Sequence, residues 1–183
     1  MKPLLTRWAK PRFVCDVHLA KVAKYLRLLG FDTIWRNDIE DDEIVAMAKM
    51  GRVGLTCDRQ LWARRPEKIV LLRCEAPKRQ LRRIVAICDL HRFAHPLART
   101  LCCNRIPVAC DKRVCMGEIP KESYRWLTGF WRCPKCKKIY WRGTHAKRMV
   151  KAAENILYEK NEMGKNALEV NTKVVTPRGL EPL

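Results

Sequence analysis

Acidic residues are scarce in this sequence, and long apolar runs are absent. Lysine and arginine number 38 against 19 aspartates and glutamates, so the 183 residues carry a formal net charge of +19. No apolar run approaches the roughly 18–20 residues that cross a bilayer, and residues 1–11 lack the apolar core of a secretory signal. We therefore expect a cytoplasmic protein without a membrane partner. Such an excess of positive charge favours a polyanionic partner, and nucleic acid is the first candidate.

The positive charge is unevenly distributed along the chain. Residues 1–60 carry a net charge of +3, whereas residues 61–183 carry +16. Five of the eight acids in the first stretch lie within 38–43, and no acid occurs between 132 and 151. This asymmetry predicts an acidic site in the first part of the chain and a polyanion-binding surface in the second.

The first half of the chain has the pattern of an α/β fold. Short apolar segments, typical of buried strands, alternate with amphipathic segments, typical of helices. The expected helices are 18–29, a helix that begins within 38–43, and 77–90; the expected strands are 12–15, 32–35, 53–56 and 68–73. This alternation implies a parallel sheet with helices on both faces, and a strand order of 2-1-3-4 makes the first and third strands neighbours.

The composition changes after residue 95. Cysteines, prolines and basic residues replace the helical period until Thr144, where a last helix begins. Such a composition is typical of a small module held together by a metal. The predicted division is an α/β domain in 1–95, a cysteine-rich module with the last helix in 96–160, and a disordered tail in 161–183.

Two aspartates directly follow predicted strands. Asp16 follows the first strand and Asp58 the third, and the acids of 38–43 come after the second. Because the carboxyl ends of parallel strands share one edge of the sheet, these carboxylates converge there and offer the oxygen ligands that Mg²⁺ or Mn²⁺ prefers. Such ions serve phosphodiester hydrolysis. The same aspartates also suit turns and helix caps, so spacing alone leaves both interpretations open.

Several motifs, taken in their order along the chain, resemble one known family. The segment 12–33, RFVCDVHLAKVAKYLRLLGFDT, resembles the opening of the PIN-like ribonuclease domain at the carboxyl end of the Mut-seven exonucleases. The later motifs follow in the family's order: Asp41-Asp42-Glu43, Leu55-Thr56-Cys57-Asp58, Cys133-Pro134-Lys135-Cys136 and Tyr140 to His145. The resemblance implies a PIN-like domain followed by a zinc ribbon, and a metal-dependent ribonuclease.

The same resemblance implies roles for particular residues. Asp16, Asp42 and Asp58 correspond to the carboxylates that bind the catalytic Mg²⁺ or Mn²⁺, with Asp41 and then Asp38 as the nearest alternatives. Three basic side chains close to this site are expected to reach RNA phosphates: Lys24, Arg27 and Arg59. A solvated helix face is an equally good interpretation of Lys24.

The zinc ribbon has one regular half and one irregular half. Cys133-x-x-Cys136 has the spacing of a zinc knuckle. The family's first half reads Arg-Cys-x-x-Cys-Asn, whereas this chain has Thr100 at the first cysteine and keeps Cys103 in register. We predict that Cys103, Cys133 and Cys136 bind zinc. The fourth ligand stays open between Cys102 and His145, the pair Cys110 and Cys115 is an alternative first knuckle, and a site without metal is a further alternative.

Basic and aromatic residues surround the regular knuckle. Cations that follow phosphates, mixed with rings that stack on bases, are typical of surfaces for single-stranded RNA. The aromatic residues are Trp131, Tyr140 and Trp141, and they also suit a small core. The expected RNA contacts are Lys135, Lys137, Lys138, Arg142 and Arg148.

Three functions are compatible with these features. The first is a Mg²⁺- or Mn²⁺-dependent ribonuclease whose basic zinc ribbon grips RNA. The second is a non-catalytic RNA- or ribosome-binding protein on a PIN-like scaffold, which is disfavoured because both Asp16 and Asp58 are present. The third is a phosphatase, which lacks a DxD nucleophile pair because Val17 and His18 follow Asp16.

Overall fold

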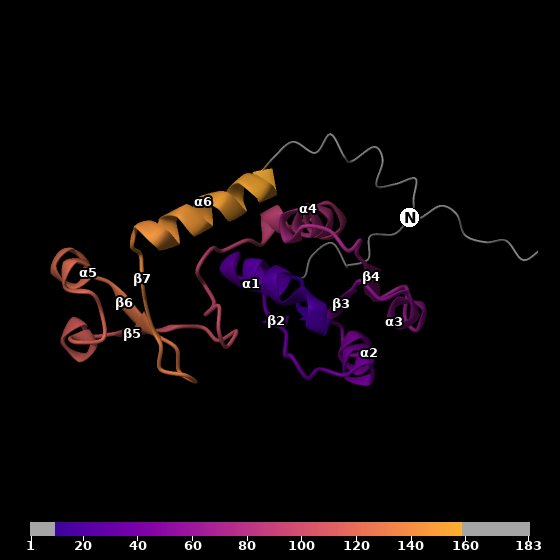
Figure 1. Cartoon of the computed structure of the whole chain (residues 1–183), viewed down its shortest axis with the longest axis horizontal. Helices are drawn as coiled ribbons and strands as arrows, with labels where there is room; N and C mark the ends of the chain where they lie inside the picture. Colours follow the sequence, from indigo (N-terminus) through magenta and orange to yellow (C-terminus); the bar gives the residue numbers. More distant parts are fainter. Residues whose placement is uncertain (1–9, 159–183) are drawn as a thin grey trace, which may run out of the picture.

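Four short parallel strands form the sheet at the centre of the larger part of the molecule. In the computed structural model, which describes residues 10–158, these strands lie in the order β2-β1-β3-β4 (Figure 1). They are β1 (Phe13–Cys15), β2 (Thr33–Ile34), β3 (Val53–Thr56) and β4 (Ile69–Leu71). The predicted strand order is therefore confirmed, and β1 and β3 are neighbours with Cys15 opposite Leu55. The predicted tail, 161–183, lies outside the described residues.

Alternate residues of each strand enter two separate apolar cores. Phe13 and Cys15 of β1 belong to one core and Val14 to the other. Such alternation follows from the two-residue period of a strand. Because both faces of the sheet are buried, the strands read as continuous apolar segments, which is typical of parallel sheets.

Three helices cover one face of the sheet. They are α1 (Ala20–Leu28), α4 (Pro77–Cys88) and α6 (Thr144–Tyr158), with the 3₁₀ turns η1 (Val17–Leu19) and η2 (Leu90–Arg92) beside them. Leu26, Ile84 and Ile156, one from each helix, are buried in the same core. The last helix, which the sequence places with the cysteine-rich module, thus packs on the larger part (Figure 1). No described helix is long and apolar enough to cross a membrane.

Two shorter helices cover the other face. They are α2 (Asp41–Lys49) and α3 (Arg59–Ala63), and they contribute Ile44 and Leu61 to the second core. The sequence did not predict α3, because five residues are too few to display a helical period. The prediction of an α/β fold with helices on both faces is confirmed.

The smaller part is an antiparallel sheet of three strands. Its strands lie in the order β5-β6-β7, and Phe130, Ile119, Ile139 and Cys115 form its core. Its elements are β5 (Val108–Cys110), the 3₁₀ turn η3 (Lys112–Cys115), α5 (Lys121–Trp126), β6 (Phe130–Arg132) and β7 (Ile139–Trp141). Four buried residues are a small core, so this part depends on further restraints.

Candidate functional site

Asp16 and Asp58 meet at the carboxyl edge of the parallel sheet. Asp16 directly follows β1, and Asp58 comes two residues after the end of the neighbouring strand β3. Thr56, the last residue of β3, connects them: its Oγ1 donates to Asp16 Oδ2 across 2.7 Å and accepts from the Asp58 N–H across 2.9 Å. One hydroxyl group therefore fixes the positions of both aspartates.

Asp16 carries a buried carboxylate that pairs with no cation among the described residues. The residue is only 6% exposed, and within residues 10–158 neither Asp16 nor Asp58 forms an ion pair. Burying a carboxylate is unfavourable unless it is paired, hydrogen-bonded or bound to a metal. The single hydroxyl bond from Thr56 satisfies part of this requirement, so the environment suits a bound cation.

Asp58 also caps a helix. Its Oδ1 accepts from the Gln60 N–H across 2.7 Å at the start of α3. The structural interpretation of Asp58 as an N-cap therefore holds. It does not compete with metal binding, because the cap occupies one of the two carboxylate oxygens.

The acids of residues 38–43 lie just before α2 or in its first turn, and three of them pair with arginines. Asp42, in the first turn of α2, is exposed and pairs with Arg64 at the end of α3. This pair lowers the pKa of Asp42, chiefly through the hydrogen bond from Arg64. Asp38 and Glu43 both pair with Arg36.

The structure thus connects only some of the residues whose carboxylates are predicted to bind the catalytic metal. Asp16 and Asp58 are joined through Thr56, whereas Asp42 is held by Arg64 and Asp41 is exposed without an ion pair among the described residues. In the described range, the one group of three or more ligand-type side chains with donor atoms within 4.8 Å of one another consists of cysteines.

Four cysteines form this second site. The sulfurs of Cys102, Cys103, Cys133 and Cys136 all lie within 4.8 Å of one another. The structure therefore brings together the three predicted zinc ligands, and among the alternatives for the fourth it is Cys102 that lies in this group. Cys110 and Cys115 form a separate pair, and His145 is exposed on α6 outside the group.

The surroundings of these thiols suit a metal. Burial raises the pKa of Cys133, but backbone hydrogen bonds from Cys136 and Lys135, together with side-chain bonds to Thr100 and Cys136, outweigh it and lower the value to about 6. Burial raises the pKa of the neighbouring Cys103. Cys102 Sγ lies 2.9 Å from the hydroxyl of Tyr140 and 3.3 Å from Cys136 Sγ. Four thiolates in a compact group are the donor set of structural zinc sites.

Thr100, at the position of the family's first cysteine, has a structural role instead. Its Oγ1 accepts from the Arg105 N–H across 3.0 Å and lies 3.8 Å from Cys133 Sγ. Its backbone N–H donates to the Arg105 carbonyl across 2.8 Å. Thr100 thus closes the turn that presents Cys102 and Cys103.

Arg27 is buried, which corrects the prediction that it contacts RNA. Its side chain donates to four backbone carbonyls, those of Thr33 (3.0 Å), Leu101 (2.9 Å), Cys102 (3.2 Å) and Trp35 (3.4 Å). A guanidinium group with these bonds is not available to phosphates. By contrast, Lys24 and Arg59 are exposed, as the prediction requires.

Asn104 completes the attachment of the cysteine turn to the sheet. Its Oδ1 accepts from the Thr33 N–H (3.1 Å), and its Nδ2 donates to Asp32 (2.8 Å). Arg27 and Asn104 together satisfy backbone groups on the free edge of β2, so the cysteine turn covers that edge.

Two residues of these sites, Thr56 and Asn104, are absent from the sequence-based predictions of site residues. A signal existed for each, since Thr56 is a polar residue that ends an apolar strand and Asn104 directly follows Cys103.

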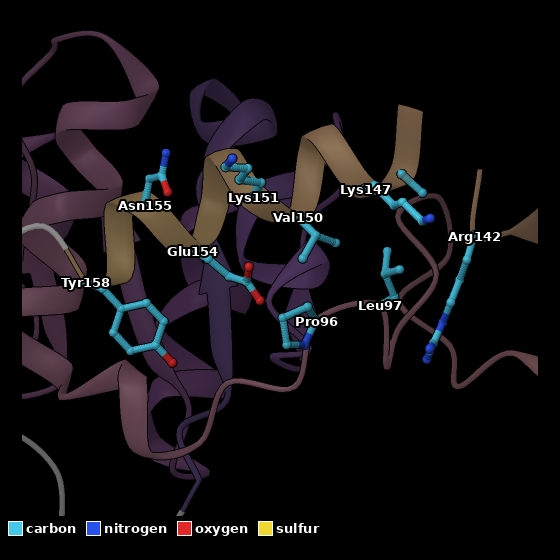
Figure 2. Close-up of a pocket in the computed structure, with 10 residues that line it drawn as sticks. Pro96, Leu97, Arg142, Lys147, Val150, Lys151, Glu154, Asn155 and Tyr158 are labelled. Atoms are coloured by element: carbon cyan, nitrogen blue, oxygen red, sulfur yellow. The ribbon is translucent and has the colours of Figure 1, made fainter. Parts of the chain in front are cut away.

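A basic groove runs along α6. It encloses about 750 Å³ and is bounded by α6 and residues 96–97. Figure 2 shows Val150, Glu154 and Tyr158 pointing from α6 toward Pro96 and Leu97. The charged residues that line the groove are Arg142, Lys147, Lys151 and Glu154, three cations against one acid.

The other predicted RNA contacts lie on the surface of the smaller part and of α6. Lys135, Lys137, Lys138 and Arg148 are exposed, and the Arg142 guanidinium lies 5.5 Å from the centre of the Trp131 ring. Of these cations, Arg142 lies over an aromatic ring, a combination that is common on surfaces for single-stranded RNA.

Comparison with known proteins adds one match. Residues 11–153 match the family model described as the Mut7-C RNAse domain. No curated protein and no solved structure matches the chain. The matched segment covers most of the chain and includes the Asp16–Thr56–Asp58 edge, the cysteine group and most of α6.

Proposed function

Because the chain belongs to the Mut7-C RNAse domain family, we propose that it is a ribonuclease in which Asp16 and Asp58 hold Mg²⁺ or Mn²⁺. Family membership supports a nuclease-type enzyme with RNA as its substrate. The metal, the carboxylates that bind it and the surfaces that hold RNA are our proposal, as are the PIN-like character of the α/β domain and the zinc ribbon.

The proposal rests above all on the connection between Asp16, Thr56 and Asp58. The Thr56 hydroxyl orients the buried carboxylate of Asp16, and its oxygen accepts the backbone N–H of Asp58. The bond to the Asp58 N–H positions the backbone of Asp58 next to Asp16 at the ligand-binding edge of a parallel sheet, which supports a site shared by the two carboxylates. A bound Mg²⁺ or Mn²⁺ would supply a Lewis acid for the phosphodiester and a more acidic water.

We further propose that Asp42 joins this site by leaving Arg64, with Asp41 as its neighbour on the same helical turn. Both members of the Asp42–Arg64 pair are substantially exposed, with side chains 81% and 43% accessible. Exposed ion pairs contribute little free energy. Asp42 therefore exchanges Arg64 for a divalent cation at low cost.

The cysteine group is proposed to bind zinc through Cys102, Cys103, Cys133 and Cys136. The small core of the three-stranded sheet makes a structural role the natural one, because metal binding contributes directly to the folding free energy of such modules. The turn that carries Cys102 is bonded to Arg27, so the metal also fixes the smaller part against the larger.

RNA is proposed to lie along the basic surface of the smaller part and the groove of α6. Lys135, Lys137 and Lys138 are exposed and flank Cys136 in the sequence, and Arg142 lines the groove. Lysines and arginines bind phosphates irrespective of sequence, and Trp131 and Tyr158 supply rings for stacking. Lys24, Arg59 and Arg148 are exposed and stay candidate phosphate contacts.

A cleavage assay on single-stranded RNA tests the enzyme proposal. End-labelled RNA is incubated with the wild-type protein, Asp16→Asn and Asp89→Asn, each with Mn²⁺ or with EDTA. Asp89 is the control because it is an exposed aspartate at the end of α4 in a left-handed conformation that asparagine tolerates. We expect cleavage by wild type and Asp89→Asn in Mn²⁺ alone.

Two outcomes of this assay contradict the proposal. Equal cleavage by Asp16→Asn would show that another nuclease is responsible for the activity. Tight binding of RNA without cleavage in any metal would favour the non-catalytic RNA-binding alternative.

A further inference from the structure

Two cysteines of the smaller part lie outside the four-cysteine group and close to each other. Cys110 ends β5 and Cys115 ends η3, and their sulfurs are 3.2 Å apart. Four thiolate or imidazole ligands are usual for structural zinc. Within residues 10–158, no further histidine, cysteine or carboxylate joins this pair to make a metal site.

The turn between the two cysteines holds them in this arrangement. Asp111 Oδ1 accepts from the Arg113 N–H across 2.7 Å and caps η3. Arg132 on β6 donates to the Val114 carbonyl and to Glu118, which flank Cys115 in the sequence. The turn is therefore fixed at both its start and its end.

The two thiols differ in access to solvent. Cys115 is fully buried among Ile119, Phe130 and Ile139, whereas Cys110 is only partly buried at the edge strand of the sheet. A small oxidant reaches Cys110 first, and Cys115 is already in place to react with the product. This is the arrangement of an oxidisable cysteine next to a resolving cysteine.

We propose that Cys110 and Cys115 are an oxidation site, at which a peroxide converts the two thiols to an intramolecular disulfide. Burial and the neighbouring Cys115 raise the pKa of Cys110, so the reaction proceeds through the small fraction of Cys110 that has lost its proton to solvent. That thiolate attacks one peroxide oxygen; the O–O bond breaks, hydroxide leaves and takes up the released proton, and Cys110 becomes a sulfenic acid. The Cys115 thiol then displaces water from that sulfur and the S–S bond forms. In total, two thiols lose two hydrogens and hydrogen peroxide becomes two waters. Reaching the S–S distance of about 2.05 Å requires the sulfurs to approach by roughly 1 Å.

The disulfide ties the edge strand β5 to η3. In a part whose core has four buried residues, this bond restrains the turn. The proposal is independent of the ribonuclease function, since it concerns neither the carboxylates nor the RNA surface.

Peptide mapping tests the proposal directly. The full-length protein is treated with hydrogen peroxide, alkylated with N-ethylmaleimide and digested with trypsin. Trypsin cleaves after Arg105, Lys112, Arg113 and Lys121, so Cys110 falls in peptide 106–112 and Cys115 in 114–121. Cys102, Cys103, Cys133 and Cys136 fall in other peptides. We expect the two peptides linked at a mass two hydrogens below their sum, and separated again by dithiothreitol.

Variants show whether the link is specific. Cys110→Ser is expected to abolish it, and Cys74→Ser, which removes an exposed cysteine of the larger part, is expected to retain it. Recovery of Cys110 and Cys115 in alkylated form after oxidation would overturn the proposal. So would their linkage to the four metal-group cysteines in the wild-type protein.

Discussion

Arg27 of α1 donates a hydrogen bond from Nη1 to the backbone carbonyl of Cys102, across 3.2 Å. The two residues are 75 positions apart in the sequence. This bond joins the α/β domain to the turn that carries two of the four clustered cysteines. One buried guanidinium group therefore ties the proposed zinc site to the α/β domain.

Replacing Arg27 is expected to destabilise the protein rather than to weaken RNA binding. Arg27→Met leaves four carbonyls without this donor, and an unsatisfied buried partner costs about 1–3 kcal/mol. Because three of the four are only partly buried and water can reach them, we expect a total loss of roughly 2–4 kcal/mol. Urea unfolding measures this loss. The control is Lys24→Met, an exposed residue one helical turn earlier, with an expected change within about 0.5 kcal/mol. Equal stability of the two variants would show that the buried bonds are not important.

Cys102 is expected to be the fourth metal ligand. Zinc measured on the untagged protein should be about one per chain, as for other four-cysteine sites. Cys102→Ser should weaken zinc binding by at least about tenfold, since a neutral hydroxyl replaces a thiolate. His145→Ala and Cys110→Ser should retain the metal, because both residues lie outside the group.

A cysteine placed at residue 100 tests the identity of the fourth zinc ligand more stringently. Thr100 Oγ1 lies 3.8 Å from Cys133 Sγ, so a sulfur at residue 100 would also be near the group. The double variant Thr100→Cys with Cys102→Ser is expected to regain zinc relative to Cys102→Ser alone. Zinc well below one per chain in the wild-type protein would contradict the metal site itself.

Releasing Asp42 from Arg64 is expected to strengthen catalytic metal binding. In Arg64→Gln, Asp42 has lost its arginine partner, so the Mn²⁺ concentration for half-maximal RNA cleavage should fall several-fold. Arg65→Gln is the matched control, because Arg65 pairs with Glu67 instead. An unchanged Mn²⁺ requirement in Arg64→Gln would remove Asp42 from the proposed site.

The groove of α6 is expected to hold RNA phosphates. Lys147→Gln with Lys151→Gln removes two of its three cations. The slope of log affinity against log salt concentration for single-stranded RNA should become shallower by about 1.4, at roughly 0.7 per phosphate contact. Lys49→Gln with Lys121→Gln, at exposed positions outside the groove, should leave the slope unchanged. Equal slopes for the two double variants would contradict the groove as an RNA site.

The sequence predicted the sheet well because burial on both faces marks each strand of a parallel sheet. The strand order then placed Asp16 and Asp58 at one edge. The strands β5, β6 and β7 were not predicted, because each has three residues among cysteines and cations and shows no clear period.

Sequence patterns could not predict those details of the sites that depend on contacts between residues far apart in the chain. Arg27 lies off the apolar stripe of its helix, and its burial comes from carbonyls more than seventy positions away. The choice of Cys102 depends on the turn closed by Thr100 and on Asn104, which adopts a left-handed conformation with φ of 56°. Neither feature can be inferred from the spacing of the cysteines in the sequence. Likewise, no local motif reveals that Asp42 pairs with Arg64.

Binding of Mn²⁺ to the protein, followed by electron paramagnetic resonance of the free ion, tests the central claim most directly. If Asp16 and Asp58 hold the catalytic metal, the wild-type protein removes the free Mn²⁺ signal as it is titrated in, and Asp16→Asn and Asp58→Asn each weaken this binding by at least about tenfold. Asp89→Asn should bind as wild type does. Mn²⁺ binding that is the same in all four proteins would contradict the assignment of the metal site to the edge formed by Asp16, Thr56 and Asp58.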